Sequence, residues 1–406
     1  MRIVRIDTAL ACVAVLAVAS PIAGASAEAA PAAGCVTAGY VAHAADSSIA
    51  AQVPFPPLQL AVEVPVEPTP FRSGGYRYLV YELHLRNHSD EAMPLGGLVV
   101  SAAGARDGAI ATLSATELRE RIRPIGPGSD IEGVLPGGKA AAVLLCLAFS
   151  VPDAVPAALA HRVRIGDALA VGPPVGTRQV EPKVLAPPVA GPDWLADNGP
   201  GLASHHRGGL FVVDGQARIS RRFAIDWKRA VDGATHAGDA ADVTSYFAYG
   251  EPVYAVADAT VVDAVDGLPD NVPRTADGFT PAVALTMENV AGNRVVLDLG
   301  DGQYAYYAHL RPGSVRVAAG DRVRRGDPLA QIGNSGDARW PHLHFQVATG
   351  PHILAAEGVP FLIDAYDVRD EDGTWRPRIR EYPIGDVIVR FAAAGDAAGD
   401  ESSAPD

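Results

Sequence analysis

The chain has 406 residues with 33 Lys or Arg against 47 Asp or Glu, which gives a formal net charge of −14. This length predicts two or three domains, and 48% apolar with 20% charged residues is typical of a folded soluble protein. An acidic chain is not expected to bind nucleic acid, which usually requires a basic surface. The three cysteines exclude a disulfide-dense scaffold and a cysteine-type zinc finger.

The N-terminal residues have the pattern of a secretory signal peptide. Arg2 and Arg5 precede an apolar run over residues 9–19, and small residues lead to a cleavage site after Ala27. The run is too short for a membrane anchor, which needs about 18 apolar residues. We therefore predict that residues 1–27 are removed and that the mature chain is exported, to a periplasm or to the outside of a cell. No transmembrane segment is expected after removal of the signal.

Two cysteines, Cys35 and Cys146, remain in the predicted mature chain. In an oxidising compartment they could form one disulfide that ties the N-terminus to a core strand. Two alternatives stay open. Cys146 could be a buried free thiol within the apolar residues 143–147, and Cys35 could carry a lipid, although Glu28 separates it from the apolar run of the signal.

Short strand patterns follow an Ala-rich, flexible lead-in over residues 28–50. Apolar and polar positions alternate from Leu58, and a longer apolar run covers residues 140–149. Gly, Pro, Asn and Asp turns separate these runs, which predicts an antiparallel, Ig-like β-sandwich at residues 51–171. This region shows no catalytic pattern of residues.

Proline-rich residues 172–200 are predicted to form a semi-extended linker between two domains. A second domain, rich in strands and turns, is expected at residues 201–368. A C-terminal extension at 369–391 ends in a last strand, and the Ala-, Gly-, Asp- and Ser-rich residues 392–406 are predicted to be disordered. The predicted fold class is all-β.

The residues that can carry chemistry lie in the second domain. His342 and His344 are two positions apart, so on a strand both imidazoles project from one face. One ring can then bind a metal while the other stabilises an oxyanion or moves a proton. His309 ends another predicted strand and could join them. A His-x-His pair alone is a weak signal, because surface strands also carry it by chance.

The ordered set of motifs is more specific than the histidine pair. Tyr-Ala-His-Leu at 307–310, Gly-Asn-Ser-Gly at 333–336 and Pro-His-Leu-His-Phe at 341–345 together resemble the lysostaphin/LytM family of zinc metallopeptidases, also described by its duplicated hybrid motif. The resemblance covers residues from about 210 to 360 and leaves out the N-terminal sandwich. It implies a compact β domain that hydrolyses peptide bonds of bacterial peptidoglycan with one zinc ion as cofactor.

The resemblance also implies roles for single residues. In that family the metal is held by a His-x-x-x-Asp motif and by the second histidine of His-x-His, which implies Asp226 and His344 as ligands. His342 and His309 are implied as catalytic residues that assist water attack and stabilise the oxyanion. The first ligand position, however, is Arg222. Its guanidinium stays protonated and offers no lone pair to a metal.

Two outcomes are open at this first ligand position. Catalytic zinc usually takes three protein ligands and a water, so His205, His206 or His236 could fold into the site as the third ligand. The chain would then be an exported metalloendopeptidase acting on peptidoglycan peptides. Alternatively, Arg222 pairs with Asp226 in place of a metal. The domain would then be an inactive relative that binds wall peptides or regulates a protein partner through the same groove.

Overall fold

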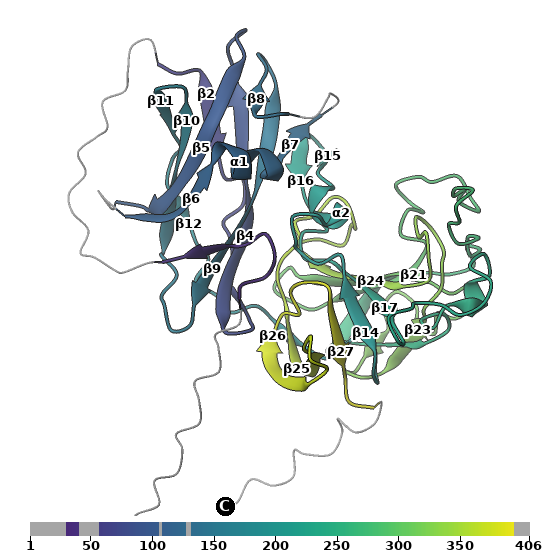
Figure 1. The fold of residues 1–406 in the computed structure, drawn as a ribbon. Coiled ribbons are helices and arrows are strands. Elements are labelled where there is room, and N and C mark those ends of the chain that lie inside the picture. Colours follow the sequence, from purple (N-terminus) through teal and green to yellow (C-terminus); the bar gives the residue numbers. More distant parts are fainter. Residues whose placement is uncertain (1–29, 40–56, 105–107, 127–130, 394–406) are drawn as a thin grey trace, which may run out of the picture. The chain divides into compact units, whose positions relative to one another are not determined.

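The computed structural model describes residues 30–39, 57–104, 108–126 and 131–393 (Figure 1). The predicted signal peptide, most of the lead-in and nearly all of the predicted tail lie outside these residues. The described residues form strands in the great majority of their regular structure, so the all-β prediction is confirmed. Among them, no helix is both long enough and apolar enough to cross a bilayer.

Two six-stranded sheets form the N-terminal part of the chain and share one apolar core. The first sheet contains β1 (Val36–Ala38), β9 (Ala140–Ser150), β4 (Tyr76–Asn87) and β2 (Leu60–Glu63) in this order, with β3 (Phe71–Ser73) paired to β4 and β7 (Ile122–Ile125) paired to β9. The second contains β11 (Ala168–Val171), β10 (Ala158–Ile165), β5 (Met93–Ala102) and β6 (Ala109–Ser114), with β12 (Val175–Gly176) paired to β10 and β8 (Val134–Leu135) paired to β5. The helix α1 (Ala115–Arg121) follows β6 and begins at a capping box formed by Ser114 and Glu117. The finer Ig-like topology stays a prediction.

The first of these sheets is buried on both faces. Along β4, Leu79 and Tyr81 pack into the core between the two sheets, whereas Tyr78 and Val80 belong to a second core made with C-terminal strands. Its neighbour β9 alternates between the same two cores. A strand covered on both faces needs no polar side, which explains why residues 140–149 are continuously apolar.

An eleven-stranded sheet forms the centre of the C-terminal part. Its strands are, in order, β13 (Val184–Leu185), β25 (Leu362–Arg369), β27 (Val387–Arg390), β14 (Trp194–Asp197), β17 (Ile225–Arg229), β24 (Leu343–Ala348), β21 (Tyr304–Leu310), β20 (Asn293–Asp298), β19 (Ala259–Val265) and β22 (Arg322–Val323), with β26 (Trp375–Glu381) paired to β25. Two small sheets pair β15 (Phe211–Val213) with β16 (Gln216–Arg218), and β18 (Pro252–Tyr254) with β23 (Pro328–Gln331). The remaining helical elements are α2 (His205–Gly208) and a 3₁₀ turn at Val243–Ser245.

The structure differs from the expected boundaries on both sides of this sheet. Residues 172–200, expected as a linker, contribute β13 and β14, and β14 lies between β17 and β27 within the sheet. Residues 369–391, expected as an extension, contribute β26 and β27. The residues on either side of β14, Asp193 and Asn198, have φ angles of 64° and 58°, so the extended backbone ends there, while the four residues of β14 pair and bury Trp194 and Ala196.

A disulfide joins Cys35 to Cys146, so neither cysteine is a free thiol in this structure. The bridge connects the segment before β1 to β9, and β1 pairs with β9 in parallel, with Val36 opposite Leu147. The two cysteines are 111 positions apart in the chain. The disulfide therefore restricts a long loop of the unfolded chain.

Replacing Cys35 by Ala should lower the free energy of unfolding of the oxidised protein by about 2–5 kcal/mol, because the unfolded chain regains the freedom that the closed loop removes. Urea unfolding of the wild type and Cys35→Ala, each with and without a reductant, measures this difference. The wild type should lose stability on reduction and the variant should not. Equal stability of the two oxidised proteins would contradict a stabilising bridge.

A buried histidine in the sandwich makes stability depend on pH. His161 is 1% exposed, and its Nε2 lies 2.9 Å from the hydroxyl of Tyr81. Burial lowers the pKa of His161 to about 4, against roughly 6.5 in an unfolded chain. The unfolded chain therefore binds a proton that the folded chain excludes, and stability is lost as the pH falls through this window.

We expect His161 alone to remove about 2 kcal/mol of the free energy of unfolding between about pH 7 and about pH 5. Urea unfolding at the two pH values measures the loss. His161→Gln, which keeps a polar group opposite Tyr81, should show a smaller loss, whereas exchange of the exposed His88 for Gln should leave it unchanged. A His161→Gln protein with the full wild-type loss would assign the effect to other groups.

Candidate active site

Four adjacent strands bring polar side chains to one face of the C-terminal sheet. The register places Asp197 of β14 opposite Asp226 of β17, and Asp226 opposite His344 of β24. His344 lies opposite Ala308 of β21, the neighbour of His309. Directly opposed residues of antiparallel strands project their side chains from the same face. Strand pairing thus gathers residues that are far apart in the sequence into one row.

His309 joins this row because β21 is irregular near its end. β20 pairs Val295 with Tyr307 and Asn293 with Leu310, so two residues of β21 oppose a single residue of β20. His309 also has a φ of 63°, in the left-handed region that few residues other than glycine adopt. A regular strand would project residue 309 away from the face of Ala308. The bulge turns the ring to the same face, as bulges beside active sites often do.

The short helix α2 brings a further histidine to Asp226. Ser204 caps this helix: its hydroxyl accepts from the backbone N–H of His206 at 3.2 Å and donates to the carbonyl of Asn198 at 2.8 Å. His206 is 1% exposed. Its Nε2 lies 3.3 Å from Oδ1 of Asp226. The cap therefore sets the direction in which the imidazole enters the site.

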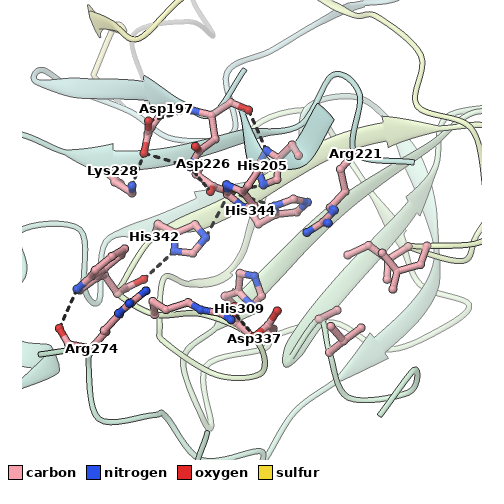
Figure 2. Close-up of a pocket in the computed structure, with 18 residues that line it drawn as sticks. Asp197, His205, Arg221, Asp226, Lys228, Arg274, His309, Asp337, His342 and His344 are labelled. Atoms are coloured by element: carbon pink, nitrogen blue, oxygen red, sulfur yellow. Dashed lines mark hydrogen bonds and ion pairs between the residues drawn. The ribbon is translucent and has the colours of Figure 1, made fainter. Parts of the chain in front are cut away.

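Three imidazoles, those of His206, His342 and His344, surround one oxygen of Asp226, and Figure 2 shows Asp226 with His342 and His344. Oδ1 of Asp226 lies 3.0 Å from Nδ1 of His344, and 3.3 Å from Nε2 of both His206 and His342. The other oxygen, Oδ2, accepts from the side-chain amide of Asn198 at 2.9 Å. All of these histidines are buried, and Asp226 is 3% exposed. One ring nitrogen of each histidine thus lies close to Oδ1 of Asp226, the carboxylate oxygen that Asn198 does not contact.

Backbone carbonyls fix the tautomers of three rings. The Nδ1 atoms of His206, His342 and His309 lie 2.9, 2.7 and 2.8 Å from the carbonyl oxygens of Asn198, Trp340 and Ser335, respectively. A carbonyl can only accept a hydrogen bond, so each Nδ1 carries the proton of the neutral ring. Each Nε2 then keeps a lone pair, as a metal ligand or a base requires.

His344 is held in the opposite tautomer. Its Nε2 lies 2.9 Å from Oε1 of Gln346. The amide nitrogen of Gln346 donates to the hydroxyl of Ser220 at 3.0 Å and to the carbonyls of Ser220 and Ile353 at 3.3 Å, which orients the amide oxygen toward His344. Nε2 of His344 therefore donates, and the lone pair is on Nδ1, facing Asp226.

The charge states agree with this assignment. Burial lowers the pKa of His344, and it lowers the pKa of His309 well below its usual range, so both rings are neutral near pH 7. Burial alone would raise the pKa of Asp226, but His206 and His342 hold it well below its usual range. Asp226 is therefore a carboxylate near pH 7.

This donor set fits a zinc ion. Neutral rings would turn the lone pairs of His206 and His344 toward a carboxylate oxygen at 3.3 and 3.0 Å, which is repulsive unless a cation lies between them. Zinc binds such atoms at about 2.0–2.1 Å, so two ligands of a tetrahedral site are ~3.3 Å apart. Asn198 and Gln346 contact the outer atoms of these ligands, as second partners do in metal sites.

The structure separates the three candidates for a substitute ligand. His206 is buried beside Asp226. His205 is exposed, with its ring centroid 4.2 Å from that of His206, at the edge of the same cavity. His236 stacks on Tyr246 at 4.9 Å between ring centroids and lines a different hollow. His205, His206 and Asp226 together form a group whose ligand atoms lie within 4.8 Å of one another, and of the three candidates His206 is the one that is buried against Asp226.

The predicted pair of Arg222 with Asp226 is wrong. Nε of Arg222 donates to Oε2 of Glu82 at 2.8 Å, Nη2 donates to Glu357 at 3.1 Å, and Nη1 donates to the carbonyl of Gly358 at 3.1 Å. Two buried carboxylates thus satisfy the guanidinium. The position beside Asp226 is left to His206.

A cavity of about 600 Å³ lies over the histidines. Its charged and aromatic lining includes Asp197, His205, Arg221, Lys228, Arg274, Asp337, Arg339 and Trp340. Lys228 pairs with Asp197, and Arg339 pairs with Asp337. In the described part of the chain, neither Arg221 nor Arg274 forms an ion pair, and they lie on opposite sides of the histidines in Figure 2. The cavity therefore has free positive charge on two sides.

Two polar residues of this site were absent from the predicted set. Gln346 had a signal, because it follows His344 by two positions and so shares its face of β24. No sequence signal pointed to Asn198. It lies within the proline-rich stretch, and it contacts His206 through its carbonyl and Asp226 through its side-chain amide. The predicted residues Asp226, His309, His342 and His344 all lie together, while their individual roles stay predictions.

Comparisons with known proteins agree with the C-terminal placement. The model of Peptidase family M23 matches residues 241–354. Glycyl-glycine endopeptidase ALE-1 of Staphylococcus capitis is 30% identical over 138 residues, which are 33% of this chain and 31% of the relative. The chain thus matches about a third of the length of that protein.

Solved structures of the same kind are also similar. The catalytic domain of lysostaphin from Staphylococcus simulans is 21% identical with a TM-score of 0.21, covering 36% of this chain and 80% of that chain. A putative peptidase M23 from Pseudomonas aeruginosa is 18% identical with a TM-score of 0.24, covering 64% and 94%.

The family match includes His309, His342 and His344 but begins after Asp226, so His206 and Asp226 are placed by the fold alone. The C-terminal part of the chain therefore carries a match to the model of Peptidase family M23 at residues 241–354.

Proposed function

We propose that the protein is an exported zinc endopeptidase that hydrolyses peptide bonds of peptidoglycan, with His206, Asp226 and His344 as metal ligands. The observation that carries this proposal is that Nε2 of His206 and Nδ1 of His344 lie 3.3 and 3.0 Å from the same carboxylate oxygen of Asp226. The M23 match supports the reaction class. The pattern of residues 1–27 supports export.

Bound zinc would supply a Lewis acid for the scissile carbonyl and lower the pKa of a water molecule. The chain's own residues would hold and move the protons. His309 and His342 each keep an Nε2 lone pair because Ser335 and Trp340 bind their Nδ1–H groups. Either ring can therefore accept a proton from the attacking water and then, when protonated, donate a hydrogen bond to the developing oxyanion.

The cavity supports a substrate that carries carboxylates. Arg221 and Arg274 lie on opposite sides of the histidines, and Nε of Arg221 is buried without a hydrogen-bond partner. A guanidinium in such a position favours a carboxylate, which can accept from it in a bidentate manner. A peptide of the cell wall with free carboxylates near the scissile bond meets this requirement.

The inactive, metal-free alternative has less support. It rests on Arg222 filling the cation position beside Asp226, and Arg222 binds Glu82 and Glu357 instead. A binding or regulatory role in the same groove would also give no reason for four histidines whose lone pairs all face the cavity.

Replacing His206 by Ala should remove the third ligand and with it both zinc and peptidase activity. The full-length mature protein should contain about one zinc per chain after dialysis against a mild chelator, and His206→Ala should contain little. Metal content by mass spectrometry and release of peptides from peptidoglycan measure the two effects. His236→Ala is the control and should keep both. A His206→Ala protein with full zinc content and activity would assign the third ligand elsewhere.

Replacing Arg274 by Ser should weaken binding of substrates with carboxylates. We expect KM to rise about 10–100-fold, because a hydrogen bond between charged groups contributes roughly 1.5–3 kcal/mol, while kcat changes little. Steady-state kinetics on wall peptides with free or amidated carboxylates separates the two cases. Amidated peptides should not distinguish the variant from the wild type. The exposed Arg324 lies outside the cavity, and Arg324→Ser should leave KM unchanged. An equal loss on both kinds of peptide would exclude this role.

A further inference from the structure

We propose that Glu82, in strand β4 of the N-terminal sandwich, positions the segments that carry His206 and Asp226, so that the sandwich is a required part of the metal site. The inference rests on the proposed zinc site and deepens it. Glu82 is 2% exposed and lies on the face of β4 that contacts the C-terminal part. It is the shared acceptor for two arginines of that part.

The first arginine, Arg207, is the neighbour of His206 in α2. Its Nε donates to Oε1 of Glu82 at 3.3 Å, and Nη2 donates to the carbonyls of Tyr81 at 2.8 Å and Leu145 at 2.6 Å. Arg207 is fully buried. A helix of four residues has little stability of its own. Contacts of Arg207 with β4 and β9 therefore hold α2, and with it His206, in place.

The second arginine, Arg222, precedes Asp226 by four positions. It binds the other oxygen of Glu82 through Nε at 2.8 Å and Nη2 at 2.6 Å. The turn that leads to Arg222 also contains Ser220, the hydrogen-bond partner of Gln346. The carboxylate of Glu82 thus holds, through Arg222, the segment that leads into Asp226. The same segment contains Ser220, which orients His344 through Gln346.

These contacts give Arg222 a role at the position where the family motif has a histidine ligand. The residue that the family motif uses as a ligand here anchors the C-terminal part to the sandwich, and the missing ligand comes from α2, which the same carboxylate anchors. Glu82 and Glu357 balance the charges of Arg207 and Arg222 in a buried network. Such a network holds its partners in one geometry only while all of its charges remain.

The test is zinc affinity of the full-length mature chain carrying Glu82→Asp, measured by competition with a chromophoric chelator. This variant keeps the charge but shortens the side chain by one methylene, so it cannot reach both arginines as before. We expect zinc binding to weaken about 10–100-fold, as when outer partners of metal ligands are changed. The visible absorption spectrum of the cobalt-substituted protein should also change, because it reports ligand geometry rather than overall stability.

Asn87→Ala is the matched control. Asn87 is buried at the end of the same strand, and its amide donates to the carbonyls of Glu91 and Leu135 within the sandwich. Its loss should lower the melting temperature but leave zinc affinity and the cobalt spectrum unchanged. Glu82→Asp with wild-type affinity and spectrum would overturn the inference.

A second variant covers the case in which Glu82→Asp does not fold. Arg207→Lys keeps the charge but lacks the planar fork that contacts Glu82 and the carbonyls of β4 and β9. It should show the same loss of zinc affinity, and a wild-type affinity would overturn the inference. A wild-type chain that binds no zinc would overturn the proposed function and this inference together, whereas zinc bound equally by the wild type and by Arg207→Lys would overturn the inference alone.

Discussion

The structure of the site depends on the fixed direction of four hydrogen bonds around Asp226. Asn198 occupies one carboxylate oxygen, and carbonyls or an amide oxygen occupy the outer nitrogen of each histidine. What remains free is one oxygen and a set of nitrogen lone pairs that face it. In the proposed zinc site, a divalent cation between these atoms would relieve the repulsion of such lone pairs. The directions of these groups thus depend on two backbone carbonyls and on the side-chain amides of Asn198 and Gln346, none of which belongs to the histidine and aspartate motifs.

The two halves of the chain also depend on contacts between residues that are distant in the sequence. Strand β4 contributes Tyr81 to the core of the sandwich and Val80 to the core of the C-terminal part. Glu82 follows on the second of these faces and meets Arg207 and Arg222. Apolar packing and a buried ionic network therefore join at one strand. The sandwich, expected from the sequence to be a separate domain, packs in the folded chain against the part that carries the histidines.

Under the proposed function, the family's ligand pattern is kept while one ligand comes from another place in the sequence. An arginine cannot ligate zinc, and by sequence this change alone suggests loss of the metal. The fold places His206 of α2 at 3.3 Å from Asp226, and with His206 as the proposed third ligand the number of ligands is preserved although their order in the chain is not. A metal site requires ligand atoms in a defined arrangement. Short helices and loops at several places in a sequence can bring a ligand into that arrangement.

The sequence by itself determined the all-β class, the location of the peptidase-like part and four residues of the site, Asp226, His309, His342 and His344. Strand periodicity and short turn motifs are local, and the face of a strand follows from its period of two. Only the tertiary structure decided that His206 lies buried against Asp226, that Arg222 binds Glu82, and that residues 172–200 and 369–391 contribute β13, β14, β26 and β27 to the sheet. It also decided that a bulge at His309 turns that ring into the cavity. These features arise because distant segments of the chain pair with one another. Contacts and buried charges between those segments stabilise them, and a single sequence does not show which segments meet.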